Sequence, residues 1–414
     1  MKRAVPPGLR ILALANDIPS PSATGLRMRL LNALRALSEI GVVDFFAIVD
    51  PVPSGPEPMP GGLDITRHLV VSRPTLDEGR LASPTLPSDF ARRDYSSVRQ
   101  AFQRWATAPY DLVWYGRLEP YVALSPQIDA PAVLDLDDLE DRKIRGRQQA
   151  GWSRSLVPEA AATGGAAWGG WDDDAERWAR LQHRAAREVA CVVLCSELDR
   201  RRFGEPNVVV VPNGYERPAH PAGRTSVGPG TTILFAGYLR YEPNIDAAQV
   251  LVDDVLPLLR LRRPEVTIRL VGINDGQIRS FADRPGVVVT GPVPDMTAEL
   301  RSADLVAVPI RFGSGTRVKI VEALAHRIPV VTTTMGCEGL DVRDGHHLLI
   351  RDSLEGFAAA CEDALSDEGL RERLTGAGHQ VYLERYESSL LRAGISHIAR
   401  RVAGNSGALR RIDA

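Results

Sequence analysis

Residues Gly313 to Glu322 combine a glycine loop, two cations and a carboxylate within a short span. If a helix begins after the loop, its unpaired backbone N–H groups and its dipole attract an anion. Arg317 and Lys319 then lie in the first turn, where the dipole disfavours cations, and a bound diphosphate would remove that conflict. Glu322 follows Lys319 by three residues and shares its helix face. Its carboxylate can accept two hydroxyls, which suits a ribose diol. The alternative is a solvated helix start with an ordinary Lys–Glu pair.

The flanking segments predict how these groups are positioned. Leu305–Ile310 is a short apolar run that ends at a turn signal, which is typical of a buried parallel strand. Apolar residues recur at helical spacing from Val318 to Ala325, Pro329 ends that helix, and Val330 begins another strand. This context favours the phosphate-binding interpretation over the solvated helix.

The first half of the chain begins with a similar unit. Leu9–Ala15 reads as a buried strand, Arg27–Ile40 as a helix and Val42–Val49 as the next strand. Right-handed crossover makes such a pair of strands parallel. The first loop lacks G-x-G-x-x-G, so a nicotinamide-dependent dehydrogenase is disfavoured.

Polar residues follow two further predicted strands. Leu112–Tyr115 ends at Tyr115 and is followed by Arg117, and Ala132–Leu136 is followed by several carboxylates. Ligands of open α/β sheets gather at the carboxyl ends of strands, so both ends are candidate sites. The acidic residues could instead cap and begin a helix, and a magnesium site is weakly supported. The acidic residues are Asp135, Asp137, Asp138 and Asp141.

Bulk properties favour a soluble two-domain α/β protein. The chain has 414 residues, 44% hydrophobic and 25% charged, with a net charge of −2, so it has no bias toward nucleic acid. Four cysteines without a metal or redox spacing suit buried thiols in a reducing cytoplasm. We expect no signal peptide and no membrane span, with at most peripheral membrane contact.

A Pro- and Gly-rich linker at 218–230 divides two α/β repeats of similar size. We expect a first domain over 1–222, a second over 223–389, and a terminal helix at 390–414 that packs back on the first. The cleft between such domains is the expected ligand site. The Trp- and Gly-rich stretch 150–174 is either a lid or a surface insertion.

The second half of the chain resembles the family 4 retaining glycosyltransferases, also called glycosyl transferases group 1. The resemblance implies the GT-B fold, in which two Rossmann-like doubly wound domains enclose a cleft. It runs in the family's order over residues 190 to 350 and is thinner in the first half. It is carried by Val208–Glu216 (VVVVPNGYE), Ile233–Ala247 (ILFAGYLRYEPNIDA), Val289–Met296 (VTGPVPDM) and Pro309–Asp341, which includes EGL at Glu338–Leu340.

The resemblance implies transfer of a sugar from a nucleotide sugar (UDP, GDP or dTDP) to a glycan or natural-product hydroxyl, with retained configuration. It implies a metal-independent hexosyltransferase without a cofactor beyond the donor. The catalytic residues expected from it are Arg240, Lys319 and Glu322. The donor-binding residues are Gly237, Asn244, Val293, Gly313, Ser314, Gly315, Thr316 and Arg317. Acceptor-side candidates are Gly25, Tyr115, Arg117 and Asp137.

Two departures from the family pattern bear on this expectation. Ser314 stands eight residues before Glu322, where the family's usual pattern has a glutamate. The loop after the second domain's first strand has Arg240 but no lysine, so we expect Lys319 to compensate. Two other functions therefore compete with transfer. One is a non-catalytic nucleotide-sugar-binding subunit, and the other is a nucleotide-sugar epimerase.

Overall fold

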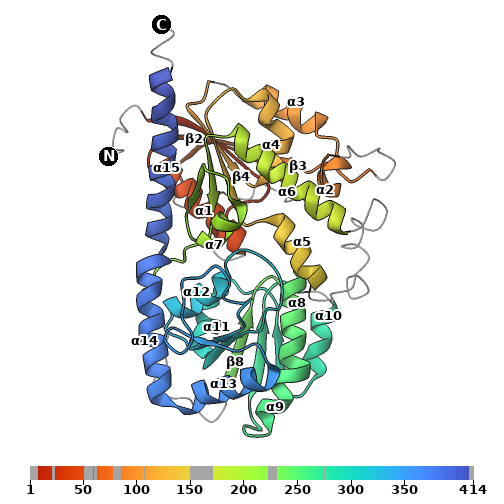
Figure 1. Ribbon diagram of the computed structural model, residues 1–414, viewed down its shortest axis with the longest axis vertical. Helices are drawn as coiled ribbons and strands as arrows, with labels where there is room; N and C mark the ends of the chain where they lie inside the picture. The colour runs from red at the N-terminus through yellow and green to blue at the C-terminus, as the bar shows by residue number, and fades with distance from the viewer. Residues whose placement is uncertain are drawn as a thin grey trace.

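The chain folds around two parallel sheets, one for each half of the sequence (Figure 1). The computed structural model describes residues 8–20, 24–50, 59, 63–77, 85–106, 109–149, 171–221, 231–274 and 276–409. The stretch 150–170 and the predicted domain boundary at 222/223 lie outside these residues.

The first sheet has seven strands in the order β3-β2-β1-β4-β5-β6-β7, and every pair is parallel. Its strands are β1 (Leu9–Ala15), β2 (Gly41–Val49), β3 (Ile65–Ser72), β4 (Leu112–Gly116), β5 (Ala132–Asp137), β6 (Cys191–Leu194) and β7 (Val208–Val210). The helices of this first domain are α1 (Gly25–Ser38), α2 (Ser88–Ala91), α3 (Ser96–Trp105), α4 (Leu118–Leu124), α5 (Glu140–Gln149), α6 (Trp171–Glu188) and α7 (Glu197–Phe203).

The second sheet has six parallel strands in the order β10-β9-β8-β11-β12-β13. They are β8 (Thr232–Ala236), β9 (Thr267–Val271), β10 (Val287–Thr290), β11 (Leu305–Val308), β12 (Val330–Thr332) and β13 (Leu349–Ile350). The helices of this second domain are α8 (Glu242–Gln249), α9 (Leu256–Arg260), α10 (Gly276–Arg279), α11 (Met296–Ser302), α12 (Val318–Ala325) and α13 (Leu354–Ser366), with a π-helical segment at Val250–Val255.

Both sheets reverse their strand order at one point. In the first sheet the reversal lies between β1 and β4, and in the second between β8 and β11. Ligands of such sheets bind in the crevice outside the carboxyl ends of the two strands at this point. The fold therefore directs attention to four loops: those after β1 and β4, and those after β8 and β11.

Alternating side chains give the first sheet two apolar faces. Leu12 and Leu14 face one core, which α3, α4 and α6 cover, whereas Ile11 and Ala13 face the other, which α1 and α15 (Ser388–Leu409) cover. Each strand must be apolar on both faces to be buried on both. This explains the nearly continuous apolar runs of the sequence.

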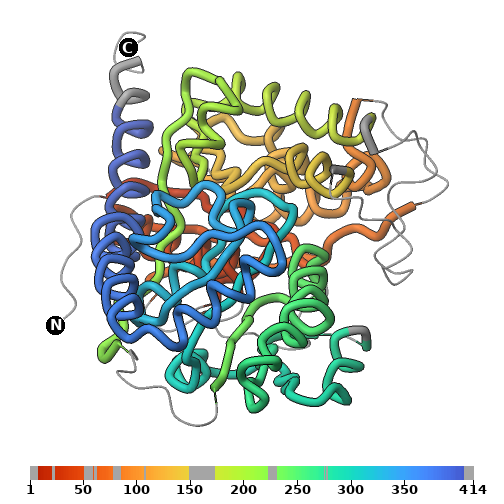
Figure 2. The backbone as a smooth tube through the Cα atoms, turned by 60° about the horizontal axis from the view of Figure 1, so that its bottom comes forward, coloured from red at the N-terminus to blue at the C-terminus, as the bar shows by residue number. Residues whose placement is uncertain are grey.

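The chain crosses between the domains twice, and the crossings are joined. Helices α14 (Glu368–Arg385) and α15 form the blue column along one side of both domains (Figures 1 and 2). At their junction the Tyr215 N–H donates to the carbonyl of Tyr386 at 2.9 Å. The Ser388 N–H donates to the carbonyl of Tyr215 at 3.0 Å. The two interdomain segments are thus hydrogen-bonded to each other.

The α/β class and the two doubly wound sheets were predicted correctly. The four cysteines are buried and free, as expected. Strand β13 and helix α4 were not predicted. Among the residues that the structure describes, no helix is long and apolar enough to cross a membrane.

Neighbouring leucines of α15 test its packing on the first domain. Leu391 is 2% exposed and belongs to the core beneath α1, whereas Leu390 is 45% exposed. Leu391→Ala should lower the free energy of unfolding by about 2–5 kcal/mol, and Leu390→Ala should change it by less than about 0.5 kcal/mol. Urea unfolding of both variants measures this. Equal losses would contradict the packing.

Candidate functional site

The glycine loop between β11 and α12 adopts a conformation that requires glycine. Gly313 has φ of 133° and Gly315 has φ of 72°, a region that other residues rarely adopt. Arg317 holds the loop from within, because its Nη1 donates to the carbonyls of Ser314 and Gly315 at 2.5 and 2.7 Å. Its Nη2 is buried and has no hydrogen-bond partner among the described residues. Arg317, which was predicted to bind the sugar donor, therefore stabilises the conformation of the loop.

Lys319 is a half-buried cation without a carboxylate partner in the described part of the chain. Its Nζ donates to Oδ1 of Asn244 at 2.7 Å and lies 4.0 Å from the ring centroid of Phe235. Burial and, to a smaller extent, the charge of Arg317 lower the pKa of Lys319 to about 7, against the opposing effect of Glu322. An anion placed here would restore the charge that burial disfavours.

Glu322 lies one turn after Lys319 on the same face of α12. Its carboxylate is half-buried and makes no hydrogen bond or ion pair within the described ranges. Burial raises the pKa of Glu322 and the charge of Lys319 lowers it by less, so the resulting pKa is about 7. A buried polar group without a partner is costly. Glu322 is therefore suited to accept hydroxyl groups from a ligand.

The loop after β8 borders this face of α12. A Cβ on Gly237, which has φ of 152°, would lie 3.0 Å from Nζ of Lys319. Asn244 reaches the same amine and also donates from Nδ2 to the carbonyl of Tyr238 at 2.9 Å. The structure thus brings together the predicted residues Gly237, Asn244 and Lys319.

Two other predicted donor residues have looser surroundings. Arg240 is exposed on the same β8–α8 loop and makes no hydrogen bond or ion pair with residues that the structure describes. Val293 follows β10 and is partly buried against the second core. Neither residue contacts Lys319 through a hydrogen bond.

The glycine loop also packs directly on the first domain. The Ser314 hydroxyl, on a residue that is 5% exposed, donates to the carbonyl of Leu139 at 3.1 Å. The Thr316 hydroxyl accepts a hydrogen bond from Nδ2 of Asn213 at 3.1 Å. A Cβ on Gly315 would lie 2.8 Å from the carboxylate of Asp138. The loop therefore faces the cleft, and the hydroxyl of Ser314 donates its hydrogen bond across the cleft to the first domain.

Helix α1 meets α12 across the same cleft. A Cβ on Gly25, the first residue of α1, would lie 2.9 Å from Cγ2 of Val318. Farther out, Arg147 pairs with Glu242, and Arg202 pairs with Glu338 at 2.7 Å. The predicted acceptor-side residue Gly25 thus lies where the two domains touch.

A buried network lies behind this interface. Arg29, 3% exposed, forms a bidentate pair with Asp135 and donates to Oδ1 of Asn213 at 2.9 Å. Although burial opposes its charge, Asp135 and Asp137 raise the pKa of Arg29 above its ordinary value. Asn213 Nδ2 also donates to Oδ1 of Asp137 at 2.8 Å. Asn213 therefore joins this network to Thr316 of the glycine loop.

The ends of β4 and β5 carry strained residues. Arg117 has φ of 85° and Asp137 has φ of 63°, an unfavourable conformation that is often retained at functional sites. Arg117 Nη1 pairs with Asp138 at 2.5 Å, and Lys143 Nζ pairs with Asp138 at 3.1 Å. Although burial opposes it, Lys143 and Arg117 hold the pKa of Asp138 well below its usual range.

These contacts account for the predicted acidic cluster. Asp135 pairs with Arg29, Asp138 with Arg117 and Lys143, and Asp141 accepts from Gln182. Glu140 and Asp141 stand in the first turn of α5, as the helix-start alternative expected. No group of three or more His, Cys, Asp or Glu that could hold a metal occurs among the described residues.

The acceptor-side assignment of Tyr115 is wrong. Its side chain is 2% exposed and lies edge-on to Tyr121 in the core covered by α4 and α6. Side chains alternate along a strand, so Trp114 and Tyr115 are buried in opposite cores of the first domain. Only the following residues, Gly116 and Arg117, reach the strand end.

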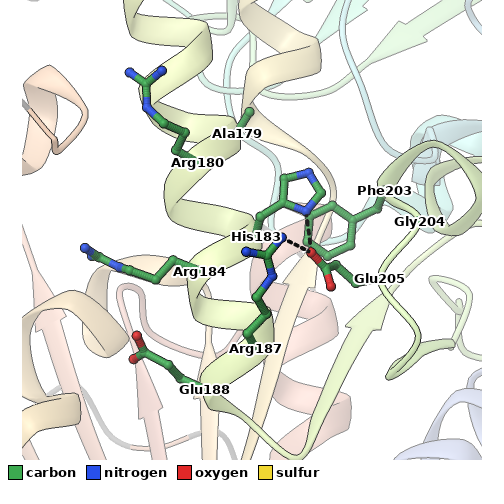
Figure 3. A pocket seen from close by; sticks show the side chains of 9 residues that line it. All are labelled: Ala179, Arg180, His183, Arg184, Arg187, Glu188, Phe203, Gly204 and Glu205. Carbon is green, nitrogen blue, oxygen red and sulfur yellow. Dashed lines mark hydrogen bonds and ion pairs between the residues drawn. The ribbon is translucent and has the colours of Figure 1, made fainter.

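Two large cavities lie in the described part of the first domain. One, of about 400 Å³, opens beside the ends of β1, β4 and β5 and includes Arg117 and Asp138. The other, of about 840 Å³, is a groove along α6 and α7 with Arg180 and His183 on its rim (Figure 3). None of the predicted catalytic residues lines the second groove.

Sequence reasoning missed Arg29, Asn213, Lys143 and Asn16. Asn213 and Asn16 follow strands β7 and β1, so the strand-end rule could have identified them. Arg29 lies inside an amphipathic helix pattern, and its partners are more than a hundred positions away in the sequence. No local pattern signals such a contact.

The sequence was compared with known proteins. Residues 230–367 match the family model described as Glycosyl transferases group 1. The "Phosphatidyl-myo-inositol mannosyltransferase" of Mycobacterium tuberculosis H37Rv is 32% identical over 230 residues, 51% of this chain and 60% of that protein. The protein of that name in Mycobacterium leprae is 31% identical over 226 residues, 51% of this chain and 59% of that protein. The chain thus spans about 60% of the curated relatives that it matches.

Solved structures share the fold at low sequence identity. Sucrose-phosphate synthase of Thermosynechococcus elongatus has a TM-score of 0.70 at 16% identity, covering 96% of this chain and 100% of that one. Anabaena HepE "in complex with UDP and glucose" has a TM-score of 0.60 at 15% identity, covering 94% and 99%. The fold is therefore GT-B, and residues 230–367 match a glycosyl transferases group 1 domain.

Lys319 predicts a stability cost that depends on pH. Its folded-state pKa is about 7 and its unfolded value is about 10.4. The cost is therefore full below pH 7 and declines as the pH rises from 7 to about 10. Lys319→Met should raise the free energy of unfolding at pH 6 by about 1–2 kcal/mol, with a smaller gain at pH 9.5.

Lys143 provides the matched control, because its amine pairs with both Asp138 and Glu140. Lys143→Met should lower the free energy of unfolding by about 1–3 kcal/mol, since it removes one of the two cations that pair with the buried carboxylate of Asp138. Chemical denaturation at both pH values measures all three proteins. A loss of stability in Lys319→Met at pH 6 would contradict the interpretation.

Proposed function

We propose that the protein transfers a hexosyl group from a nucleoside diphosphate sugar to an acceptor hydroxyl and retains the anomeric configuration. The observation that carries this proposal is the pair Lys319 and Glu322, two half-buried charges on one face of α12 beside the glycine loop. The group 1 domain and relatives named as mannosyltransferases support the same reaction.

The proposed donor site follows from the chemistry of these groups. The amides of the glycine loop, Lys319 and the exposed Arg240 would bind the diphosphate. Glu322 would accept the ribose hydroxyls, and Val293 would border the nucleobase. A UDP, GDP or dTDP sugar fits this set, and HepE, which shares the fold, is described as a complex with UDP.

Breaking the sugar–diphosphate bond places negative charge on the leaving phosphate. Cations and amides that bind this charge more tightly in the transition state accelerate the step. Lys319 can supply such stabilisation, because a diphosphate raises the pKa that burial has lowered. In a retaining transfer the leaving phosphate can itself take the acceptor proton, so no separate protein base is assigned.

Contacts across the cleft would exclude water from the reacting bond. The glycine loop is already closed on Leu139, Asn213 and Asp138. Such closure limits hydrolysis of the donor. We propose that the reaction takes place in the cytoplasm and needs no cofactor besides the donor.

A nucleotide-sugar-binding subunit without transfer activity is the second candidate. It is favoured by Ser314, which replaces the usual glutamate and whose hydroxyl donates its hydrogen bond to the carbonyl of Leu139. An epimerase is less favoured, because its proton transfer at the sugar needs a carboxylate and Ser314 occupies one natural position for it. Incubating the donor alone and analysing the sugar separates the epimerase from both other functions.

Variants of α12 test the proposal. Lys319→Ala and Glu322→Ala should each lower transfer by at least about 100-fold, since each removes donor or transition-state contacts. Product formation is measured by mass spectrometry after a donor screen by thermal shift with UDP, GDP and dTDP sugars. Arg180→Ala, which changes an exposed residue of α6, is the control and should be active. Wild-type rates for both α12 variants would remove the proposal.

Chelation tests the proposed metal independence. The carboxylates at the end of β5 are engaged by Arg29, Arg117 and Lys143, and Lys319 would neutralise the leaving group. EDTA should therefore change the transfer rate less than about twofold. Strong inhibition that magnesium reverses would instead indicate a metal-assisted reaction.

A further inference from the structure

The cavity of about 400 Å³ in the first domain has a built polar lining. Its volume falls within the range of about 300–1,000 Å³ that is typical of small-molecule sites. It lies at the point where the strand order of the sheet reverses. Its lining comes from the loops after β1, β3, β4 and β5 and from helices α1, α2, α4, α5 and α6.

The cavity adjoins the glycine loop of the second domain. Asp138 lines it, and a Cβ on Gly315 would lie 2.8 Å from the same carboxylate. A molecule in the cavity would therefore lie on the first-domain side of the loop proposed to hold the donor. This placement suits the molecule that receives the sugar.

The charges that line the cavity balance. Four are positive and four are negative, and most are paired with one another, for example Arg73 with Glu119 at 2.8 Å and Lys143 with Glu140 at 2.9 Å. The positive residues are Arg73, Arg93, Arg117 and Lys143, and the negative ones are Asp89, Glu119, Asp138 and Glu140. A charged ligand would find no net opposite charge here, whereas hydroxyl groups can both donate to the carboxylates and accept from the cations.

Two polar side chains of the lining have unused hydrogen-bonding capacity. The amide of Asn16 follows β1, is half-buried and makes no hydrogen bond with the described residues. Asp89 on α2 is exposed, and its carboxylate has no hydrogen bond or ion pair in the described part of the chain. Together they offer two donors and several acceptors to a ligand with adjacent hydroxyls.

One wall of the cavity is aromatic. Phe90 of α2 and Trp178 of α6 both line it, and their ring centroids lie 4.9 Å apart in an edge-on arrangement. A saccharide or cyclic polyol presents polar edges and a less polar C–H face. The polar groups of the lining thus suit the hydroxyl edges of such a ring, and the aromatic wall suits its C–H face.

We propose that this cavity binds a neutral polyhydroxylated ring, a saccharide or cyclic polyol, as the acceptor. The inference rests on the proposed transfer function and names its acceptor class. It selects against acidic sugars, which meet a balanced charge, and against apolar aglycones, which would strip water from many charged groups. Asn16 and Asp89 are the specificity-determining residues.

Direct binding tests the cavity without the need for turnover. Saturation-transfer NMR with methyl α-glucopyranoside and myo-inositol should show binding to the wild-type protein. Sodium glucuronate and 4-methylumbelliferone should bind at least about tenfold more weakly. Asn16→Ala and Asp89→Ala should each weaken polyol binding at least about fivefold.

Controls separate this cavity from the donor site. Asp283→Ala removes an exposed carboxylate of the second domain and should bind the polyols like the wild type. Lys319→Ala should lose nucleotide binding in calorimetry but retain polyol binding. Asn16→Ala and Asp89→Ala should retain nucleotide binding, which also establishes that they fold.

The outcomes distinguish the two proposals. Equal polyol binding by the wild type and both cavity variants would overturn the inference, as would tighter binding of glucuronate or 4-methylumbelliferone. Transfer to an apolar aglycone without polyol binding would overturn it and leave the transferase proposal intact. Polyol binding that both cavity variants lose, without transfer to any acceptor, would support the cavity and contradict the transferase proposal.

Discussion

Two charges on α12 are held in the protein without the partners that would ordinarily neutralise them. Lys319 contacts the amide of Asn244 and the ring of Phe235, and the carboxylate of Glu322 has no hydrogen bond with the described residues. Burial pulls both pKa values toward 7. Such an arrangement is unfavourable in the free protein and is retained where a ligand completes it.

The elements around α12 keep this arrangement in place. The reversal of strand order brings the loops after β8 and β11 together, so Gly237 and Asn244 border Lys319. Arg317 fixes the glycine loop by binding its carbonyls. The first domain then closes on that loop through Ser314 and Thr316. Each layer positions the next, from sheet order to loop shape to domain contact.

The sequence predicted the parts of this site that are local. Apolar runs identified most strands because parallel sheets are buried on both faces, and the spacing of Lys319 and Glu322 placed them on one helix face. The partners of Arg29 and Asn213 could not be predicted, because they come from distant strands whose neighbours only the sheet order defines. Tyr115 was misplaced because a strand that is apolar on both faces gives no sign of which side chain faces the cleft.

The joined interdomain crossings limit how the cleft can open. Because Tyr215 is hydrogen-bonded to both sides of the α14–α15 junction, the two segments bend together, and relative sliding or twisting of the domains would break those bonds. Asn213, two residues before Tyr215, lies next to these crossings in the chain and is bonded to the glycine loop. Asn213 therefore connects the joined crossings to the glycine loop, so a substitution at this one residue affects the domain crossing and the proposed donor loop together.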